Sequence, residues 1–174
     1  DKGYYDFDIS YRIIPVNETD VDVSFFVEEG EKLVIREIVF AGNENVDEDE
    51  LADSIATSTY RWWSSWATGS GVLKQEQLKQ DVGLLTNYYL SNGYVDVRVA
   101  DPVIERIDDG LRLTYEIVEG QFYKFGDIKA EGDLLKGGEA EVLADIGSIK
   151  GETFNFSKMR DDSFKISEKY TDIG

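Results

Sequence analysis

The sequence predicts an α+β fold of tandem β-α-α-β-β modules, each with a three-stranded mixed sheet covered on one face by two helices. The prediction rests on a helix–glycine–strand unit at residues 78–99, on a repeat with an offset of 90 residues, and on the order of the apolar patterns. In the first part of this unit, Leu78, Val82, Leu85 and Tyr89 recur every three or four residues. That spacing is typical of one apolar face of an α-helix.

A glycine ends the predicted helix, and a strand follows at once. Gly93 is expected to adopt the left-handed backbone conformation of a helix C-cap, which a residue with a Cβ resists. Val95, Val97 and Val99 then alternate with polar residues, which is the period of a half-buried strand. We therefore expect a strand at residues 94–100.

Short matches recur in the same order 90 residues apart. The matching segments are 3–7 with 93–97, 27–30 with 117–120, 37–38 with 127–128, and 42–43 with 132–133. Residues 170–174 also resemble residues 89–93. Several matches in one order at one offset indicate a repeated module.

The apolar patterns divide the chain into three segments. Residues 1–30 are expected to form a β-hairpin with one apolar face, residues 31–120 one complete module, and residues 121–174 the first half of another. In the middle segment we expect strands at 33–41, from 94 and at 111–117, and helices at 47–56 and 75–92, with a turn at Asp109-Gly110. In the last segment we expect a strand at 122–131 and helices at 139–146 and 157–170, the longer one capped by Ser157.

The order of these elements limits the sheet of the middle segment. Its last two strands form a hairpin, so they are antiparallel neighbours. The two helices bring the chain back so that the first strand runs parallel to the last. The third strand is therefore expected at the centre, with the first and second strands at the edges and both helices on one face.

Composition excludes several classes of function. The formal net charge of −18 repels nucleic acids and anionic lipid head groups. The chain contains no cysteine and no histidine, so it has no disulfide, no thiolate metal site and no histidine base. We expect no cofactor, no metal and no insertion of this segment into a membrane.

The chain resembles POTRA domains, the periplasmic repeats of the outer-membrane β-barrel assembly factors (the BamA-like family). The residues that carry the resemblance are Ile38-Val39-Phe40-Ala41-Gly42-Asn43, the tryptophan loop with Thr68-Gly69-Ser70-Gly71, Asp81, Tyr88-Tyr89-Leu90 and Gly93-Tyr94. The tryptophan pair before a glycine-rich turn looks most like the third POTRA of a five-domain array. The resemblance makes residues 1–30 the C-terminal β-hairpin of a preceding POTRA, 31–120 a complete POTRA, and 121–174 the N-terminal β-α-α part of the next.

The resemblance implies a non-enzymatic periplasmic scaffold that belongs to an outer-membrane protein. It implies that the scaffold receives unfolded outer-membrane proteins and docks accessory lipoproteins. The edge of a three-stranded sheet offers unpaired backbone groups to which an extended client can add as a strand. The client-binding edge is predicted at Tyr94, Val95, Asp96, Val97, Arg98, Val99 and Ala100.

Five further residues are singled out. Trp62, Trp63 and Trp66 lie in one loop, where aromatic side chains either finish a small core or contact a neighbouring POTRA or a partner. We expect at least one tryptophan in each role. Gly42 and Gly93 are expected to be structural turn residues.

Other functions remain open from the sequence. Two-partner secretion transporters and the translocation and assembly module also carry POTRA domains, as do cell-division proteins, which look like single-copy cases. A remote alternative is an acidic hydrolase that uses a pair of carboxylates. Its candidates would be Asp47, Asp49 and Glu50, or Asp108 and Asp109, or Asp161 and Asp162. Each cluster lies at a helix start or a turn, where acidic residues are expected for local reasons.

The two outer segments are complementary. The first supplies the two hairpin strands of a module, and the last supplies a strand and two helices, so each exposes an apolar face. We expect the last segment of one molecule to bind the first segment of another, giving a domain-swapped dimer or a chain of molecules.

Overall fold

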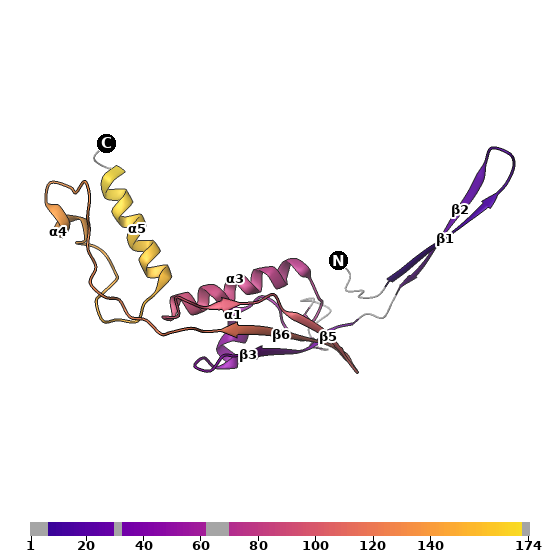
Figure 1. Cartoon of the computed structure of the whole chain (residues 1–174), viewed down its shortest axis with the longest axis horizontal. Helices are drawn as coiled ribbons and strands as arrows, with labels where there is room; N and C mark the ends of the chain where they lie inside the picture. Colours follow the sequence, from indigo (N-terminus) through magenta and orange to yellow (C-terminus); the bar gives the residue numbers. More distant parts are fainter. Residues whose placement is uncertain (1–6, 30–32, 62–69, 172–174) are drawn as a thin grey trace.

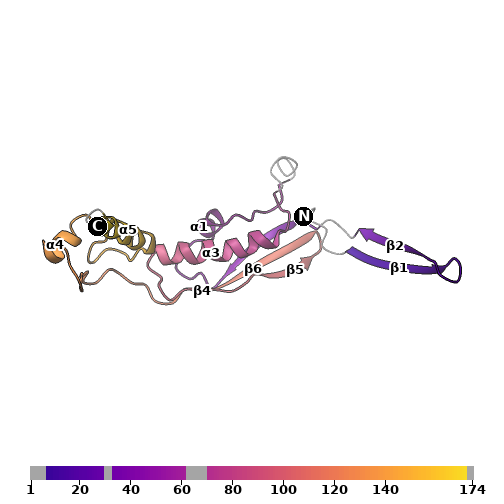
Figure 2. The same ribbon diagram turned by 90° about the horizontal axis from the view of Figure 1, so that it is seen from above.

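The computed structural model describes residues 7–29, 33–61 and 70–171. Three parts follow one another along the long axis (Figure 1). They are an N-terminal hairpin, a central module at residues 33–120 and a tail module at residues 121–171. Two perpendicular views place the hairpin at one end and the tail module at the other (Figures 1 and 2).

The N-terminal hairpin consists of β1 (Phe7–Pro15) and β2 (Val21–Glu29). The strands pair antiparallel, with Tyr11 opposite Phe25 and Ile13 opposite Val23. Asn17 closes the loop, because its side-chain oxygen accepts the backbone N–H groups of Thr19 and Asp20. The predicted hairpin is therefore present.

The central module has the predicted element order. Its elements are β3 (Ile35–Ala41), α1 (Glu48–Ser54), α3 (Gln75–Ser91), β4 (Arg98–Val99), β5 (Val103–Ile107) and β6 (Gly110–Val118). The central strand, β6, pairs parallel with β3 on one side and antiparallel with β4 and β5 on the other. The predicted strand order is thus confirmed.

One difference concerns the number of strands. The predicted second strand is two pieces, β4 and β5, so the sheet has four strands. Val99 pairs with Ile117 and Val103 pairs with Thr114, so three residues on the edge lie opposite two residues of β6. The extra residue on the edge defines a β-bulge. Pro102 lies in this bulge, where its missing N–H removes no ladder hydrogen bond.

The core of the central module lies between the helices and one face of the sheet. Along β6, Leu111, Leu113, Tyr115 and Ile117 are buried, while the residues between them are partly or fully exposed. The last three of these residues pack in one cluster with Leu51 of α1 and with Leu78, Leu85 and Tyr89 of α3. Both helices therefore cover the same face, as predicted.

The tail module contains α4 (Gly138–Val142) and α5 (Phe156–Thr171). The predicted strand at 122–131 has only two isolated bridges, Tyr94 to Phe122 and Lys124 to Thr153. The prediction of a strand was wrong here, because the described residues include no neighbour that continues a ladder along this segment. The N-cap prediction was also wrong: Asn155 accepts the N–H of Lys158 at 2.8 Å, whereas Ser157 contacts the Ser91 hydroxyl.

Candidate partner-binding surfaces

The predicted client-binding edge is divided between two places. Arg98 and Val99 lie on the sheet edge, opposite Val118 and Ile117 of β6. The Ala100 N–H donates to the Glu116 carbonyl at 3.0 Å. These three residues belong to the edge.

Residues 94–97 lie at the junction with the tail module. Tyr94 is buried, and its ring packs edge-to-face on Phe122 with 5.6 Å between the centroids. Asp96 accepts the hydroxyl of Tyr123 at 2.7 Å. Val95, predicted to face the core, is 42% exposed, because the inward-facing residue after the glycine is Tyr94. Placing this segment on the sheet edge was therefore wrong.

Gly93 holds this junction together. Its φ of +95° lies in the left-handed region. The N–H of Tyr94 donates to the Tyr89 carbonyl at 3.0 Å, which is the longer hydrogen bond of a Schellman motif. A Cβ on Gly93 would lie 2.7 Å from the Phe122 ring. The structural role predicted for this glycine fits both its φ and its packing.

Gly42 occupies a second tight turn. Its φ is +91°, and a Cβ there would meet the Ile117 carbonyl oxygen at 2.1 Å. The end of β3 therefore approaches β6 more closely than any residue with a side chain permits.

The other edge of the sheet is β3. The start of this strand is covered, since the Ile35 N–H donates to Gly71 and its carbonyl accepts the Tyr60 N–H, both at 2.8 Å. From Glu37 to Ala41, no strand in the described part of the chain pairs with the outer side of β3. This edge is continuous, whereas the β4–β5 edge is broken by a bulge.

A groove of about 370 Å³ lies beside β3. Its apolar part is formed by Ile38, Phe40 and Ile55. Its acidic side includes Glu48, Asp49 and Asp53 of α1. No local pattern in the sequence indicates this groove, because it exists only where α1 packs beside β3.

Asp81 organises the interior of the central module. This fully buried carboxylate accepts the N–H groups of Ala56 and Thr57 at 2.7 and 3.2 Å, and the hydroxyl of Tyr115 at 2.9 Å. Burial and the adjacent negative charge raise the pKa of the Tyr115 phenol, so it remains a hydrogen-bond donor. The network joins α3, the segment after α1 and β6.

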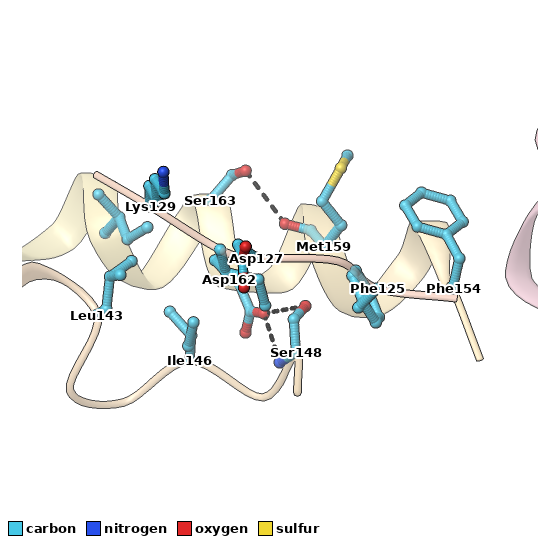
Figure 3. Close-up of a pocket in the computed structure, with 12 residues that line it drawn as sticks. Phe125, Asp127, Lys129, Leu143, Ile146, Ser148, Phe154, Met159, Asp162 and Ser163 are labelled. Atoms are coloured by element: carbon cyan, nitrogen blue, oxygen red, sulfur yellow. Dashed lines mark hydrogen bonds between the residues drawn. The ribbon is translucent and has the colours of Figure 1, made fainter. Parts of the chain in front are cut away.

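The tail module repeats this arrangement with Asp162. Its carboxylate accepts the N–H group of Gly147 at 2.6 Å. It also accepts the N–H and the hydroxyl of Ser148, at 2.8 and 2.5 Å (Figure 3). Although burial opposes ionisation, hydrogen bonds from these two residues and the nearby Lys165 lower the pKa of Asp162. Both buried aspartates therefore tie the long helix to the segment after the short helix.

The acidic clusters considered for a hydrolase have structural surroundings. Glu50 accepts the hydroxyl of Tyr88, and burial together with this hydrogen bond raises the pKa of Tyr88 to about 12. Asp109 lies 3.4 Å from the Arg36 guanidinium. Among the described residues, no three acidic side chains are grouped to hold a metal ion. The described helices also include none that is long and apolar enough to cross a membrane.

Trp62, Trp63 and Trp66 lie outside the described residues. Their predicted division between packing and contact stays a prediction.

The observed module, with two helices on one face and a first strand parallel to a central last strand, has the architecture of a POTRA domain. The family model for POTRA, described as "surface antigen variable number repeat", matches residues 33–120. The chain belongs to this family.

Relatives named as outer-membrane protein assembly factors support the assignment. The BamA of Nitratidesulfovibrio vulgaris is 32% identical over 99% of this chain and 22% of its own length. The BamA of Neisseria meningitidis serogroup B is 27% identical over 81% of this chain and 18% of its own length. The chain therefore spans about a fifth of the length of these relatives.

A solved structure shares the fold. The crystal structure of Haemophilus influenzae BamA POTRA3-5 matches with a TM-score of 0.62 and 22% sequence identity. The match covers 79% of this chain and 54% of that one.

Proposed function

We propose that this chain is a periplasmic scaffold region of an outer-membrane protein and acts in the assembly of outer-membrane β-barrel proteins. The observation that carries the proposal is the POTRA module at residues 33–120 in a chain similar to assembly factors along almost its whole length. The names of these relatives favour the assembly factors over secretion transporters and the translocation and assembly module. The role is non-enzymatic, and the partners are unfolded outer-membrane proteins and accessory lipoproteins.

The domain organisation follows from the same proposal. Residues 1–30 are the closing hairpin of one POTRA, 31–120 are a complete POTRA, and 121–174 begin the next. The junction at Gly93 supports this division, because hydrogen bonds cross from the end of α3 to residues 123 and 155.

Clients bind by adding a strand to a sheet edge. Backbone hydrogen bonds at an edge recognise an extended chain whatever its side-chain sequence, which suits clients that share only alternating β patterns. The structure favours the β3 edge for this role, since its outer side is continuous from Glu37 to Ala41 and a groove lies beside it. The edge at Arg98, Val99 and Ala100 is the weaker second site, because its bulge interrupts the row of backbone groups with which a client strand would pair.

The groove beside β3 also determines which client side chains are favoured. Ile38, Phe40 and Ile55 accept an apolar residue, and the carboxylates of α1 attract a neighbouring lysine or arginine. The favoured segment is therefore an extended strand with an apolar residue beside a basic one.

The test uses a synthetic strand of alternating apolar and polar residues with flanking lysines. Hydrogen exchange of the full chain should show added protection at 37–41 when the peptide binds, and a backbone N-methylated peptide should give none, because it cannot pair. Reversing Asp49 and Asp53 to lysine should weaken binding at least about fivefold by loss of attraction. Asp161→Lys together with Glu168→Lys, both exposed on α5 and away from either sheet edge, is the matched control and should leave affinity unchanged. Equal binding of the N-methylated peptide would rule out strand addition.

A further inference from the structure

The groove beside β3 is lined by charges of both signs. Glu48 and Asp49 line it at the start of α1, and Asp53 lines it further along this helix. Arg61 lines the groove from the segment that follows α1. All four side chains are exposed, so a bound chain can reach them.

The path of the chain separates these charges. The Tyr60 N–H donates to the Ile35 carbonyl at 2.8 Å, which places the neighbouring Arg61 near the start of β3. α1 follows β3 after a short loop, in which the Asn43 side chain donates to the Val46 carbonyl at 3.0 Å. The helix lies near the end of the strand in both views (Figures 1 and 2). The groove therefore has a basic end near the start of β3 and an acidic end near the end of β3.

Arg61 is available to a ligand. Within the described residues, its guanidinium has no ion-pair or hydrogen-bond partner. By contrast, Arg36 of β3 lies 3.4 Å from the Asp109 carboxylate and over the ring of Tyr60. An acidic side chain of a bound strand can therefore pair with Arg61 without displacing an existing partner.

The free edge of β3 is short and closed at its basic end. The Gly71 carbonyl accepts the Ile35 N–H, and the Tyr60 N–H donates to the Ile35 carbonyl, so the edge is occupied there. In the described part of the chain, residues 37–41 are the stretch whose outer side is unpaired. One end of an added strand therefore stops beside Arg61, while the other end passes the carboxylates of α1. The two ends of the strand meet charges of opposite sign.

Backbone pairing adds a preference for direction. An antiparallel ladder is slightly more stable per residue than a parallel one. The N-terminal half of an antiparallel strand on β3 lies at the acidic end of the groove, and its C-terminal half stops at the basic end. Charge and backbone pairing therefore agree only when the basic residue of the strand comes first and the acidic residue last.

We propose, building on strand addition at β3 as the proposed function, that this groove selects client strands by the order of their charges. The favoured strand runs antiparallel to β3, with a lysine or arginine toward its N-terminus and an aspartate or glutamate toward its C-terminus. Its basic residue lies beside Glu48 and Asp49, and its acidic residue lies beside Arg61.

Two peptides of identical composition test the order of charges. Both are acetylated and amidated around an alternating apolar and polar centre; one has lysine first and glutamate last, and the other is reversed. The lysine-first peptide should bind the full chain at least about fivefold more tightly, because each exposed charge pair contributes modestly. The difference should shrink in about 0.5 M salt, which screens exposed charges. Equal affinities would overturn the selection by charge order alone, whereas no binding of either peptide would overturn strand addition as well.

Cross-linking reports the direction itself, because the chain has no cysteine of its own. Glu44→Cys provides an exposed thiol past the end of β3, and Ser58→Cys provides one near its start, where the Ser58 carbonyl accepts the Gly71 N–H. A lysine-first peptide with an N-terminal cysteine should form a disulfide with Glu44→Cys at least about fivefold faster than with Ser58→Cys, since the bond requires close Cα atoms. Moving the peptide cysteine to the C-terminal end should reverse this preference. Equal rates at the two sites, or the opposite preference, would contradict the antiparallel direction.

A charge reversal tests the contact at the basic end. Arg61→Glu should weaken binding of the lysine-first peptide at least about threefold, and replacing the glutamate of the peptide by lysine should restore the affinity. Lys79→Glu makes the same charge change at an exposed position of α3 outside the groove, so it is the matched control and should leave affinity unchanged. A loss of affinity that the second peptide does not restore would show that Arg61 does not contact the acidic residue of the client.

Discussion

The central and tail modules each contain a buried aspartate at the equivalent place in the long helix, Asp81 and Asp162, but they differ in what covers it. In the central module, β6 lies across the core and Tyr115 reaches Asp81. In the tail module, Asp162 is held by Gly147 and Ser148, and the segment at 123–131 forms no continuous ladder. The helices form in both modules, but the extended first strand forms only where a central strand pairs with it. The comparison indicates that the helical layer is built locally, whereas the sheet depends on a partner strand.

The largest effect is expected from removing Asp81. Asp81→Ala leaves two backbone N–H groups and the Tyr115 hydroxyl without an acceptor, which should destabilise the central module by about 3–5 kcal/mol. Asp162→Ala should destabilise the tail module by only about 1–2 kcal/mol, because Gly147, one of its donors, is partly exposed and its N–H can bond to water instead. Hydrogen exchange measured separately in α3 and α5 gives both values. An equal loss of stability in the two variants would show that the open face of the tail module does not lower the cost of removing its aspartate.

The next effect concerns the junction between the two modules. Gly93→Val should destabilise the chain by about 1–3 kcal/mol, because φ is +95° and the new side chain would displace Phe122. Gly83→Ala is the control, since Gly83 is exposed in α3 and a Cβ there would meet nothing within 4 Å. It should stabilise the helix by about 0.5–1 kcal/mol. Urea unfolding measures both changes, and opposite signs are the expected result.

A smaller effect is expected from removing the Tyr115 hydroxyl, which bonds to the buried aspartate of the central module. Tyr115→Phe should destabilise the central module by about 1–2 kcal/mol, since Asp81 loses one of three donors. Tyr123→Phe removes an exposed hydroxyl bonded to Asp96 and should change stability by less than about 0.5 kcal/mol. Thermal unfolding followed by circular dichroism compares them. A neutral Tyr115→Phe would mean that water replaces the lost hydroxyl.

The smallest effect is a pH dependence of the tail module. The pKa of Asp162 is lower in the folded chain than its ordinary value of about 3.9. The ionised carboxylate therefore stabilises the tail module above that pH, and the contribution is lost as the pH falls through the lowered pKa. The stability difference between the unmodified chain and Asp162→Asn should be present at pH 7 and shrink below about pH 4. A difference that stays constant down to pH 2 would contradict the role of the charge.

Most of the central module could be predicted from the sequence. The apolar spacing from Leu78 to Tyr89, the glycine after it, and the alternation along β6 each follow from a local period. The candidate edge was harder, because residues 94–100 have the pattern of one strand. Whether Val95 or Tyr94 faces inward is decided by Phe122 and Tyr123, which pack from the next module.

The helices, the left-handed glycine turns and the family of this protein could all be inferred from the order of its residues. A helix forms its hydrogen bonds within itself, and a glycine turn depends on one residue's backbone freedom, so both are visible in a short stretch of chain. Tertiary packing was needed to settle which extended segments are strands, where the β4–β5 edge is broken, and that a groove lies between β3 and α1. A strand takes its hydrogen bonds from residues far away in the sequence, and a groove exists only between elements that have already packed.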